Sequence, residues 1–138
     1  MIGLDTNVLA RYYVEDDGDS EAKKQREAAR GLIESGKSLM VCKTVLLELE
    51  WVMRGYYKFS TAQVAAVLNH LLALPQVTVE DRASVVQALS NCEAGLELAD
   101  ALHHASYRGC ESMASFDDKQ FARRSRRMGL APRVVVPG

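Results

Sequence analysis

The chain has 138 residues, the length of one ordinary domain, and 48% of them are hydrophobic while 25% are charged. This balance is typical of a soluble globular protein with a single core. The formal net charge of −1 excludes a polycation that binds nucleic acid through its overall charge. The sequence also argues against a membrane protein, because no apolar run reaches the ~20 residues of a membrane span.

The cysteines indicate neither a zinc site nor a disulfide framework. Cys42, Cys92 and Cys110 lie far apart and form no CxxC pair. An odd and sparse set fits reduced thiols, so we expect a cytoplasmic protein. The N-terminus becomes acidic at Asp5, too early for a signal peptide, and we interpret it as a strand.

Short apolar runs alternate with helical periods along the chain, which predicts βα units and a mainly parallel sheet. In chain order, the first half predicts a strand at 2–4, a helix or turn at 7–14, a helix at 20–35, a strand at 39–42 and helices at 45–57 and 60–74. The second half predicts a strand at 77–79, helices at 81–95 and 96–108, a strand at 112–116, a basic helix at 118–128 and a strand at 134–136.

Several residues predict where these helices begin and end. Ser20, Thr44 and Asp81 are expected N-caps, and Ser60 with Gln63 has the spacing of a capping box. Gly36 and Pro75 are typical of the residues that follow a helix.

Two acids follow predicted strands directly. Asp5 comes after the strand at 2–4, and Asp117 comes after the strand at 112–116. Ligands of open α/β sheets bind beyond the carboxyl ends of the strands, which makes both acids candidate ligands. Either one alone could instead be an ordinary helix cap or turn residue.

Glu48 is expected to lie on the apolar stripe of its helix, together with Val45, Leu49 and Val52. A carboxylate in such a place is costly unless it is paired, protonated or bound to metal. Because no basic partner is near in sequence, metal ligation is the favoured interpretation. Glu50 and Arg54 are expected to pair in solvent on the opposite side.

Asp100 is predicted on the polar side of the helix at 96–108, with Glu97, His103 and His104. That side could simply be solvated, or could be a mixed nitrogen and oxygen metal site. The other candidate acids offer only oxygen, which suits Mg²⁺ or Mn²⁺ better than zinc. We therefore expect His103 and His104 to support the ligands or face RNA at most.

The residues after Asp118 include no further acid but six basic side chains: Lys119, Arg123, Arg124, Arg126, Arg127 and Arg133. They could form a solvated helix face or hold a phosphate backbone. Arg123, Arg124 and Arg127 are the candidate contacts to a nucleic acid.

Four segments together resemble the motifs of PIN-domain nucleases. MIGLDTNVLARYYVEDD resembles the opening strand and turn, with Asp5-Thr6-Asn7 in the characteristic place. VLLELEWVMRGYYKFS is similar to the second motif of VapC-type toxins, where the acid three residues before the tryptophan is Glu48. GLELADALHHA resembles the third motif and selects Asp100. MASFDDKQFAR resembles the fourth and selects Ser115 and Asp117, with Asp118 as the neighbouring alternative.

This resemblance implies a single PIN-like domain over residues 1–138, with an α/β class fold: a three-layer α/β/α sandwich around a central, mainly parallel sheet. It also implies a ribonuclease that uses Mg²⁺, or Mn²⁺, held by Asp5, Glu48, Asp100 and Asp117. Thr6, Asn7 and Ser115 would orient ligands or contact phosphate. A VapC-like toxin would have RNA as its substrate, a cognate antitoxin as its partner, and a homodimeric assembly.

Other classes fit the sequence less well. A haloacid-dehalogenase-type phosphotransferase usually has a second Asp two residues after the first, where this chain has Asn7. A receiver domain needs an acidic pair in its first loop. A non-catalytic PIN-like binding module typically loses an acid, and an RNA-processing nuclease that is not a toxin stays open as an alternative.

The predicted helices at 45–57 and 61–74 carry more apolar side chains than one small sheet can readily cover. Candidates for an exposed partner surface are Trp51, Met53, Tyr56, Tyr57, Leu72 and Leu74. The alternative is that these side chains belong to the ordinary core.

Overall fold

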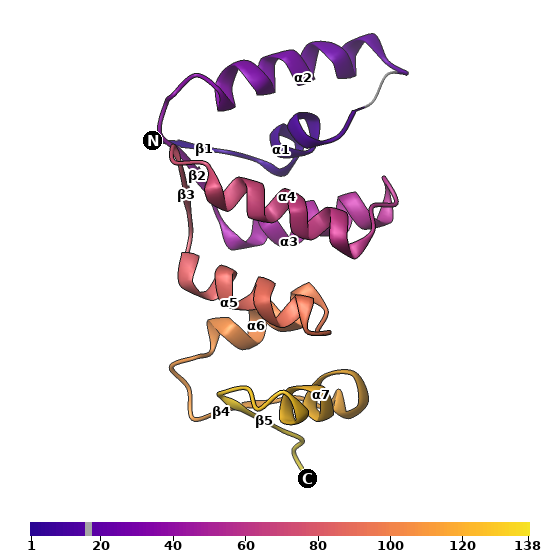
Figure 1. The fold of residues 1–138 in the computed structure, drawn as a ribbon, viewed down its shortest axis with the longest axis vertical. Coiled ribbons are helices and arrows are strands. Elements are labelled where there is room, and N and C mark those ends of the chain that lie inside the picture. The colour runs from indigo at the N-terminus through magenta and orange to yellow at the C-terminus, as the bar shows by residue number, and fades with distance from the viewer. Residues whose placement is uncertain (16–17) are drawn as a thin grey trace. The chain divides into compact units, whose positions relative to one another are not determined.

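The computed structural model describes residues 1–15 and 18–138, so Asp16 and Asp17, at the end of the first motif, lie outside the described residues. The chain forms two compact units, Met1–Glu80 (unit 1) and Asp81–Gly138 (unit 2). Figure 1 shows unit 1 in indigo to rose and unit 2 in orange to yellow. Each unit is described by itself.

Unit 1 is a three-stranded parallel sheet with four helices in its connections. Its elements are β1 (Ile2–Gly3), α1 (Thr6–Tyr13), α2 (Ser20–Ile33), β2 (Leu39–Val41), α3 (Lys43–Gly55), α4 (Thr61–Ala73) and β3 (Val77–Val79). The strand order is β1-β2-β3, and Leu39 of the central strand pairs with Ile2 on one side and Val77 on the other. Parallel neighbours need crossover connections, which these helices provide, and the predicted βα units are therefore confirmed in unit 1.

The core of unit 1 joins the sheet to its helices. Helix α1 packs against α2 and α3, α3 packs against α4, and α4 packs against β3 (Figure 1). The fully buried side chains come from all of these layers: Leu9, Ile33, Leu39, Val41, Leu49, Met53 and Leu71. Each such side chain contributes about 1.5–3 kcal/mol through removal of its surface from water.

Two of the expected helix starts in unit 1 are wrong by one or two residues. Asp19, not Ser20, caps α2, and its Oδ1 accepts from the backbone N–H of Glu21 at 2.9 Å. Helix α3 begins at Lys43 after Cys42, so Thr44 lies inside the first turn, with its hydroxyl 3.2 Å from Cys42 Sγ. The exact residue at which a helix begins depends on the local backbone conformation, and neighbouring polar residues can often serve as the N-cap equally well.

The capping box of α4 is confirmed. The backbone N–H of Gln63 donates to Ser60 Oγ at 3.1 Å, and the backbone N–H of Ser60 donates to Gln63 Oε1 at 2.8 Å. Gly36 follows α2 with a φ of +82°, a backbone conformation that favours glycine.

Unit 2 contains a helical pair and a small parallel sheet. Its elements are α5 (Arg82–Glu93), α6 (Leu98–Ser106), β4 (Ser112–Ala114), the π-helical turn η1 (Asp118–Ala122), α7 (Arg123–Arg127) and β5 (Arg133–Val135). Strands β4 and β5 pair in parallel, with Met113 opposite Val134. Helix α5 packs against α6, while η1 and α7 pack against each other and against β5.

One expectation for unit 2 is confirmed in part and another needs correction. Asp81 is the N-cap residue of α5, as expected, but its φ is +49° and its side chain makes no capping hydrogen bond; its Oδ1 lies 3.3 Å from Arg108 Nη2. The single basic helix expected at 118–128 is a π-helical turn followed by a short α-helix. The wider turn places Phe121 and Ala122 in the core of the unit.

Both sheets are parallel and their crossovers are helical, which confirms the α/β class and is consistent with the expected α/β/α sandwich. No helix among the described residues has the length and apolar character needed to span a bilayer.

Candidate active site

Asp5 is exposed at the carboxyl end of β1, where it is also the N-cap of α1. Its Oδ1 accepts from the backbone N–H of Thr6 at 2.8 Å. The side chain of Thr6 is buried, and its Oγ1 has no hydrogen-bond partner among the described residues. A buried hydroxyl without a partner is uncommon, and here it lies directly beside an exposed carboxylate.

The second element of this site is α3, which follows β2 in the same sheet. The backbone N–H of Leu4 donates to Met40 O at 2.9 Å, so β1 and β2 run together up to the points where α1 and α3 begin. Because α1 also packs against α3, unit 1 brings Asp5 and the helix that carries Glu48 to one edge of the sheet.

Glu48 is exposed, and the expectation that it lies on the apolar stripe is wrong. The buried face of α3 is formed by Leu46, Leu49 and Met53. At about 100° per residue, Glu48 lies well off the centre of that face, toward the side of the exposed Trp51. Within the part of the chain that the structure describes, Glu48 has no hydrogen-bond or ion-pair partner.

Glu50 is engaged elsewhere on the same helix. Its Oε1 lies 2.9 Å from Arg54 Nη1, which confirms the expected pair, although the Glu50 side chain is only 13% exposed rather than fully solvated. Of the two acids of the second motif, Glu48 is therefore the one available to a ligand.

In unit 2, Asp100 lies in the first turn of α6 and belongs to an acidic group. Its pKa is raised above the ordinary value, first by burial and then by the negative charges of Glu97 and Asp117, while His103 opposes the shift. Asp100 and Asp117 are therefore near enough to repel each other. A group with this character gains from a bound cation, which would remove the repulsion.

Asp117 and Asp118 differ in what they contact. Asp117 is exposed, its backbone N–H donates to Ser115 Oγ at 3.1 Å, and its Oδ1 accepts from the backbone N–H of Gln120 at 3.0 Å. Asp118 has its Oδ2 3.0 Å from both Nε and Nη2 of Arg123. The fourth motif thus holds Asp118 in an ion pair, whereas the charge of Asp117 acts on Asp100.

The two histidines of α6 face different surroundings. His103 is exposed and close enough to Asp100 to lower its pKa. His104 is buried, with Nε2 2.7 Å from Pro132 O and its ring in an edge-to-face contact with Phe121. The expectation that His104 supports the ligands or faces RNA is therefore wrong, because its side chain belongs to the core of unit 2.

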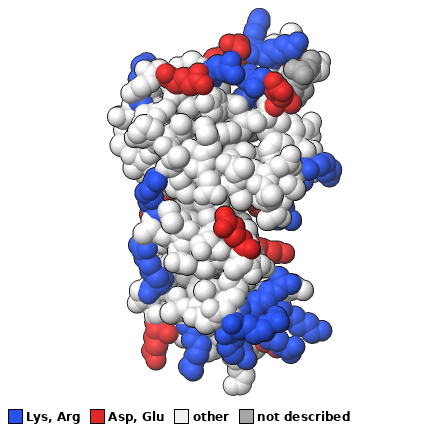
Figure 2. All heavy atoms as spheres, viewed as in Figure 1, with Lys and Arg blue, Asp and Glu red and all other residues white. Residues whose placement is uncertain are grey.

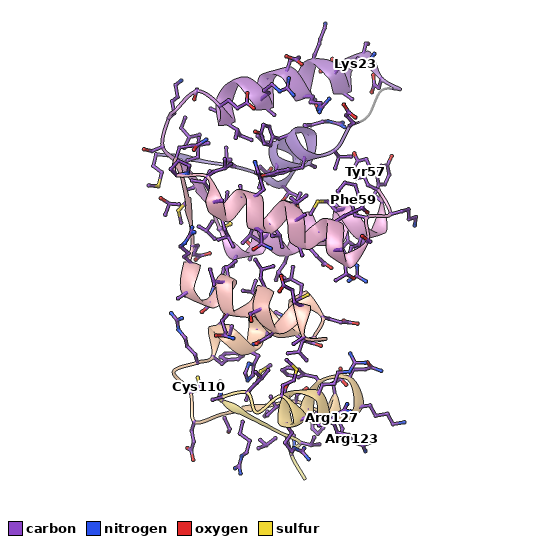
Figure 3. All side chains as sticks on the ribbon, in the orientation of Figure 1. Lys23, Tyr57, Phe59, Cys110, Arg123 and Arg127 are labelled. Carbon is purple, nitrogen blue, oxygen red and sulfur yellow. The ribbon has the colours of Figure 1, made fainter. Side chains whose placement is uncertain are left out.

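Most of the C-terminal arginines lie on α7, where Figure 2 shows a dense cluster of Lys and Arg side chains. Arg123, Arg126 and Arg127 line an open hollow of about 540 Å³. Arg124 points elsewhere, since its Nη1 donates to Gly95 O at 2.9 Å. Figure 3 labels Arg123 and Arg127, which lie next to each other at this hollow.

Among the residues that the structure describes, no three His, Cys, Asp or Glu side chains are grouped so that they could hold a metal ion. Asp5 and Glu48 belong to unit 1, and Asp100 and Asp117 belong to unit 2. Within each unit the candidate donors are carboxylates, the ligand type that suits a hard divalent cation, and in unit 1 Thr6 adds a hydroxyl with no partner among the described residues.

The predicted apolar surface of α3 and α4 is only partly right. Trp51 is 72% exposed and Tyr56 is 74% exposed, but Met53 and Leu72 are buried in the core. The remaining two, Tyr57 and Leu74, are half-buried.

Sequence reasoning missed two features. Phe116 is 82% exposed between Ser115 and Asp117, and Arg126 lines the hollow on α7. An aromatic residue inside a short polar segment that ends in a candidate catalytic acid was the signal available for Phe116.

The comparisons agree with the motif analysis. The profile of the PIN domain family matches residues 2–126, a stretch that contains the candidate acids of all four motifs and reaches into both units. A comparison with curated proteins gave no match.

Proposed function

The chain belongs to the PIN domain family, whose members are in general nucleases that bind RNA and use divalent metal ions, and we propose that it is a Mg²⁺-dependent endoribonuclease. Within this proposal, Asp5, Glu48, Asp100 and Asp117 hold the cation, with Mn²⁺ as an alternative ion. The toxin half of a type II toxin–antitoxin pair is the biological role that we propose for it, in the cytoplasm.

One observation carries the catalytic part of the proposal: in unit 2 the pKa of Asp100 is raised by burial and then by the negative charges of Glu97 and Asp117. An acid whose pKa is perturbed by burial and by specific charged neighbours is characteristic of a functional site. The exposed, unpaired Glu48 and the unpaired Thr6 Oγ1 support the same assignment in unit 1.

Each residue then has a distinct task. When bound, a divalent cation would lower the pKa of a water molecule and neutralise charge that builds on the phosphate. The four acids would supply oxygen ligands, the type that magnesium prefers. Ser115 fixes the backbone at Asp117 through its 3.1 Å hydrogen bond, while Thr6 and Asn7 would orient ligands or contact phosphate beside Asp5.

The proposed toxin role has two partners, a second copy of the chain and a cognate antitoxin. Trp51 on α3 and Tyr56 at its end are exposed, and they support a partner surface because Trp and Tyr are enriched at protein–protein interfaces. An amphipathic antitoxin segment would bind an apolar surface, and an arginine on it would contact the acids through a bidentate carboxylate pair.

Cleavage of a structured RNA, assayed with Mg²⁺ and again in excess chelator, tests the catalytic proposal. We expect cleavage that requires the metal and returns when Mg²⁺ or Mn²⁺ is restored. Metal-independent cleavage would contradict it, and complete absence of cleavage with either ion would favour the non-catalytic PIN-like binding module.

Growth of a bacterium that expresses the chain tests the toxin role separately. We expect growth arrest, and we expect it to be relieved by the product of an adjacent gene for a small DNA-binding protein. Metal-dependent cleavage without growth arrest would instead support an RNA-processing nuclease.

A further inference from the structure

We propose that Glu80 is a positioning residue for the acid that α3 carries: its carboxylate holds the start of α3 from the end of the neighbouring strand, and so fixes where Glu48 lies at the edge of the sheet in unit 1. This inference rests on the proposed function, in which Glu48 is a cation ligand. It adds a residue outside the four motifs on which that ligand depends.

Helix α3 begins differently from the other helices of unit 1. Asp5, Asp19 and Ser60 cap α1, α2 and α4 through their own side chains. Cys42, the N-cap residue of α3, makes no side-chain capping hydrogen bond. Because the first N–H groups of a helix have no partner within it, α3 depends on an acceptor from another element or on solvent.

Glu80 supplies such an acceptor from the carboxyl end of β3. Its Oε1 accepts from the backbone N–H of Lys43, the first residue of α3, at 2.9 Å. The backbone N–H of Glu80 donates to Val41 O, also at 2.9 Å, which continues the β2–β3 pairing by one residue. Glu80 is therefore bonded on both sides of Cys42, at the junction between β2 and α3.

The chemistry of this contact is that of a helix cap supplied by a distant residue. A carboxylate beside the first N–H groups of a helix interacts favourably with the positive end of the helix dipole. A hydrogen bond to a charged acceptor is also stronger than one to a neutral acceptor. Since two hydrogen bonds tie Glu80 to the junction, its contact restrains the direction in which α3 leaves the sheet.

That direction determines the position of Glu48, which lies in the second turn of α3. On its other side, β2 is bonded to β1 through the backbone N–H of Leu4 and Met40 O at 2.9 Å, directly before Asp5. The end of β2 is thus held from both neighbouring strands, and Glu80 extends this hold to the helix. A displacement of a functional group by about 1 Å can cost 100-fold in activity, so a small change in the start of α3 matters for a ligand on it.

Three variants separate the reach of the Glu80 side chain from its charge. Glu80→Gln keeps the length and an oxygen that accepts the N–H of Lys43, but it loses the charge. Glu80→Asp keeps the charge, but its side chain is shorter by one methylene group. Glu80→Ala loses both. A positioning residue requires the reach, whereas a direct cation ligand requires the charge.

Asp19→Ala is the matched control. It removes the side chain that caps α2, whose Oδ1 accepts from the backbone N–H of Glu21 at 2.9 Å. It therefore costs a capping hydrogen bond in the same unit, but on a helix that carries none of the four candidate acids.

Calorimetric titration with Mg²⁺, in the absence of RNA, measures the affinity for the cation. We expect Glu80→Ala and Glu80→Asp to bind Mg²⁺ about 10-fold more weakly than wild type, the lower end of the loss for groups that orient a metal ligand. Glu80→Gln should bind close to wild type. Asp19→Ala should lower the melting temperature without changing the affinity for Mg²⁺.

Amide hydrogen exchange of the metal-free protein locates the effect on the chain. We expect the amides in the first turn of α3 to exchange about 10-fold faster in Glu80→Ala, the loss for a hydrogen bond to a charged group, and also faster in Glu80→Asp. Glu80→Gln should protect them as wild type does. In Asp19→Ala the faster exchange should be confined to the start of α2.

Three results overturn the inference: Mg²⁺ affinity of Glu80→Ala equal to that of wild type, a loss in Glu80→Gln as large as that in Glu80→Ala, or an equal loss in Asp19→Ala. The second would make the charge decisive, and the third would reduce the effect to general stability. Circular dichroism checks the folding of each variant. If Glu80→Ala does not fold, the comparison of Glu80→Gln with Glu80→Asp decides.

Failure of the inference and failure of the proposed function are separable. Wild-type protein that binds Mg²⁺ and cleaves RNA, while none of the Glu80 variants alters the affinity, overturns the inference alone. Wild-type protein that neither binds Mg²⁺ nor cleaves RNA overturns the proposed function and the role of Glu80 at the cation site, even where hydrogen exchange shows that Glu80 fixes the start of α3.

Discussion

Arg123 donates from its Nε to Oδ2 of Asp118 across 3.0 Å, and its Nη2 lies at the same distance from that oxygen. This contact gives the two adjacent acids of the fourth motif different surroundings, because Asp117 keeps its carboxylate at the start of η1, near Asp100. An acid that is already neutralised by a guanidinium is a poorer cation ligand than one that is not.

Exchanging each of these acids for its amide tests that difference. We expect Asp117→Asn to lower metal-dependent cleavage by more than about 100-fold, beyond the loss typical of residues that only support a ligand. Asp118→Asn should retain most activity and lose at most about 1 kcal/mol of stability, since its ion pair is partly exposed. Single-turnover cleavage and urea unfolding measure the two effects. Equal losses of activity in both variants would contradict the assignment of Asp117.

Asp5→Asn should abolish RNA cleavage while preserving the fold. The amide still accepts a hydrogen bond at the N-cap of α1, where Asn and Asp are about equally good, so stability should change by less than about 0.5 kcal/mol. The charge that would hold the cation is lost. Asp19→Asn, which changes the capping acid of α2 in the same way, is the matched control and should stay active. Undiminished activity of Asp5→Asn would falsify its role as a ligand.

Glu48→Gln should also remove cleavage. Glu48 is exposed and has no hydrogen-bond or ion-pair partner among the described residues, so no structural contact accounts for its carboxylate. Glu50→Gln, two positions along α3, breaks the pair with Arg54 and should affect stability more than activity. The comparison of cleavage rates with melting temperatures separates the two acids. An active Glu48→Gln together with an inactive, fully folded Glu50→Gln would reverse the assignment.

Asp100→Asn should leave the metal-free protein as stable as wild type at neutral pH, or more stable by up to about 1 kcal/mol, since solvent screens a half-exposed group. The pKa of Asp100 is raised in the folded protein, so its ionisation opposes folding. The protonated Asp100 carboxyl therefore contributes stability to the wild type at low pH, and this contribution is lost as pH rises through the folded-state pKa. The Asn variant shows no such loss.

Chemical unfolding between pH 3 and neutral pH, with and without Mg²⁺, measures this effect. Magnesium should stabilise the wild type more than Asp100→Asn, because it binds only the native state; at a concentration of 100 times Kd the gain is about 2.7 kcal/mol. A large loss of stability in the metal-free variant would indicate a structural role for Asp100 instead.

Light scattering tests the proposed assembly. We expect a homodimer whose mass falls to that of a monomer in Trp51→Ser/Tyr56→Ser, and we expect the wild type to bind the product of the adjacent antitoxin gene. Val86→Ser, at an exposed apolar residue of α5, is a control that should not alter the mass. A strict monomer that remains active beside that product would overturn both the dimer and the toxin role.

The order and type of the elements could be predicted from the sequence, because apolar periodicity distinguishes helices from strands directly. The capping box of Ser60 and Gln63 was also predictable, down to its individual hydrogen bonds. Helix starts were less accessible: Asp19 and Ser20 are both good caps, and only the backbone conformation decides between them.

The candidate acids could be selected from the sequence by motif, but their surroundings could not. Glu48 was expected among apolar neighbours, yet the buried face of α3 is centred on Leu46, Leu49 and Met53, which the wheel alone did not identify. His104 was expected on the polar side of α6, together with Asp100 and His103. Its contact with Pro132 involves a residue distant in sequence, and local periodicity contains no information about such a partner.

Asp5 and Asp117 share a further property. Each commits its Oδ1 to a backbone N–H, that of Thr6 at 2.8 Å and that of Gln120 at 3.0 Å. The rotamer of each carboxylate is thus selected by the start of the following helix, and the conformational entropy of that side chain is already lost on folding. A cation that binds the remaining oxygen therefore removes less conformational freedom from the side chain. The affinity of these acids for a cation thus depends on the length of their side chains as well as on their charge.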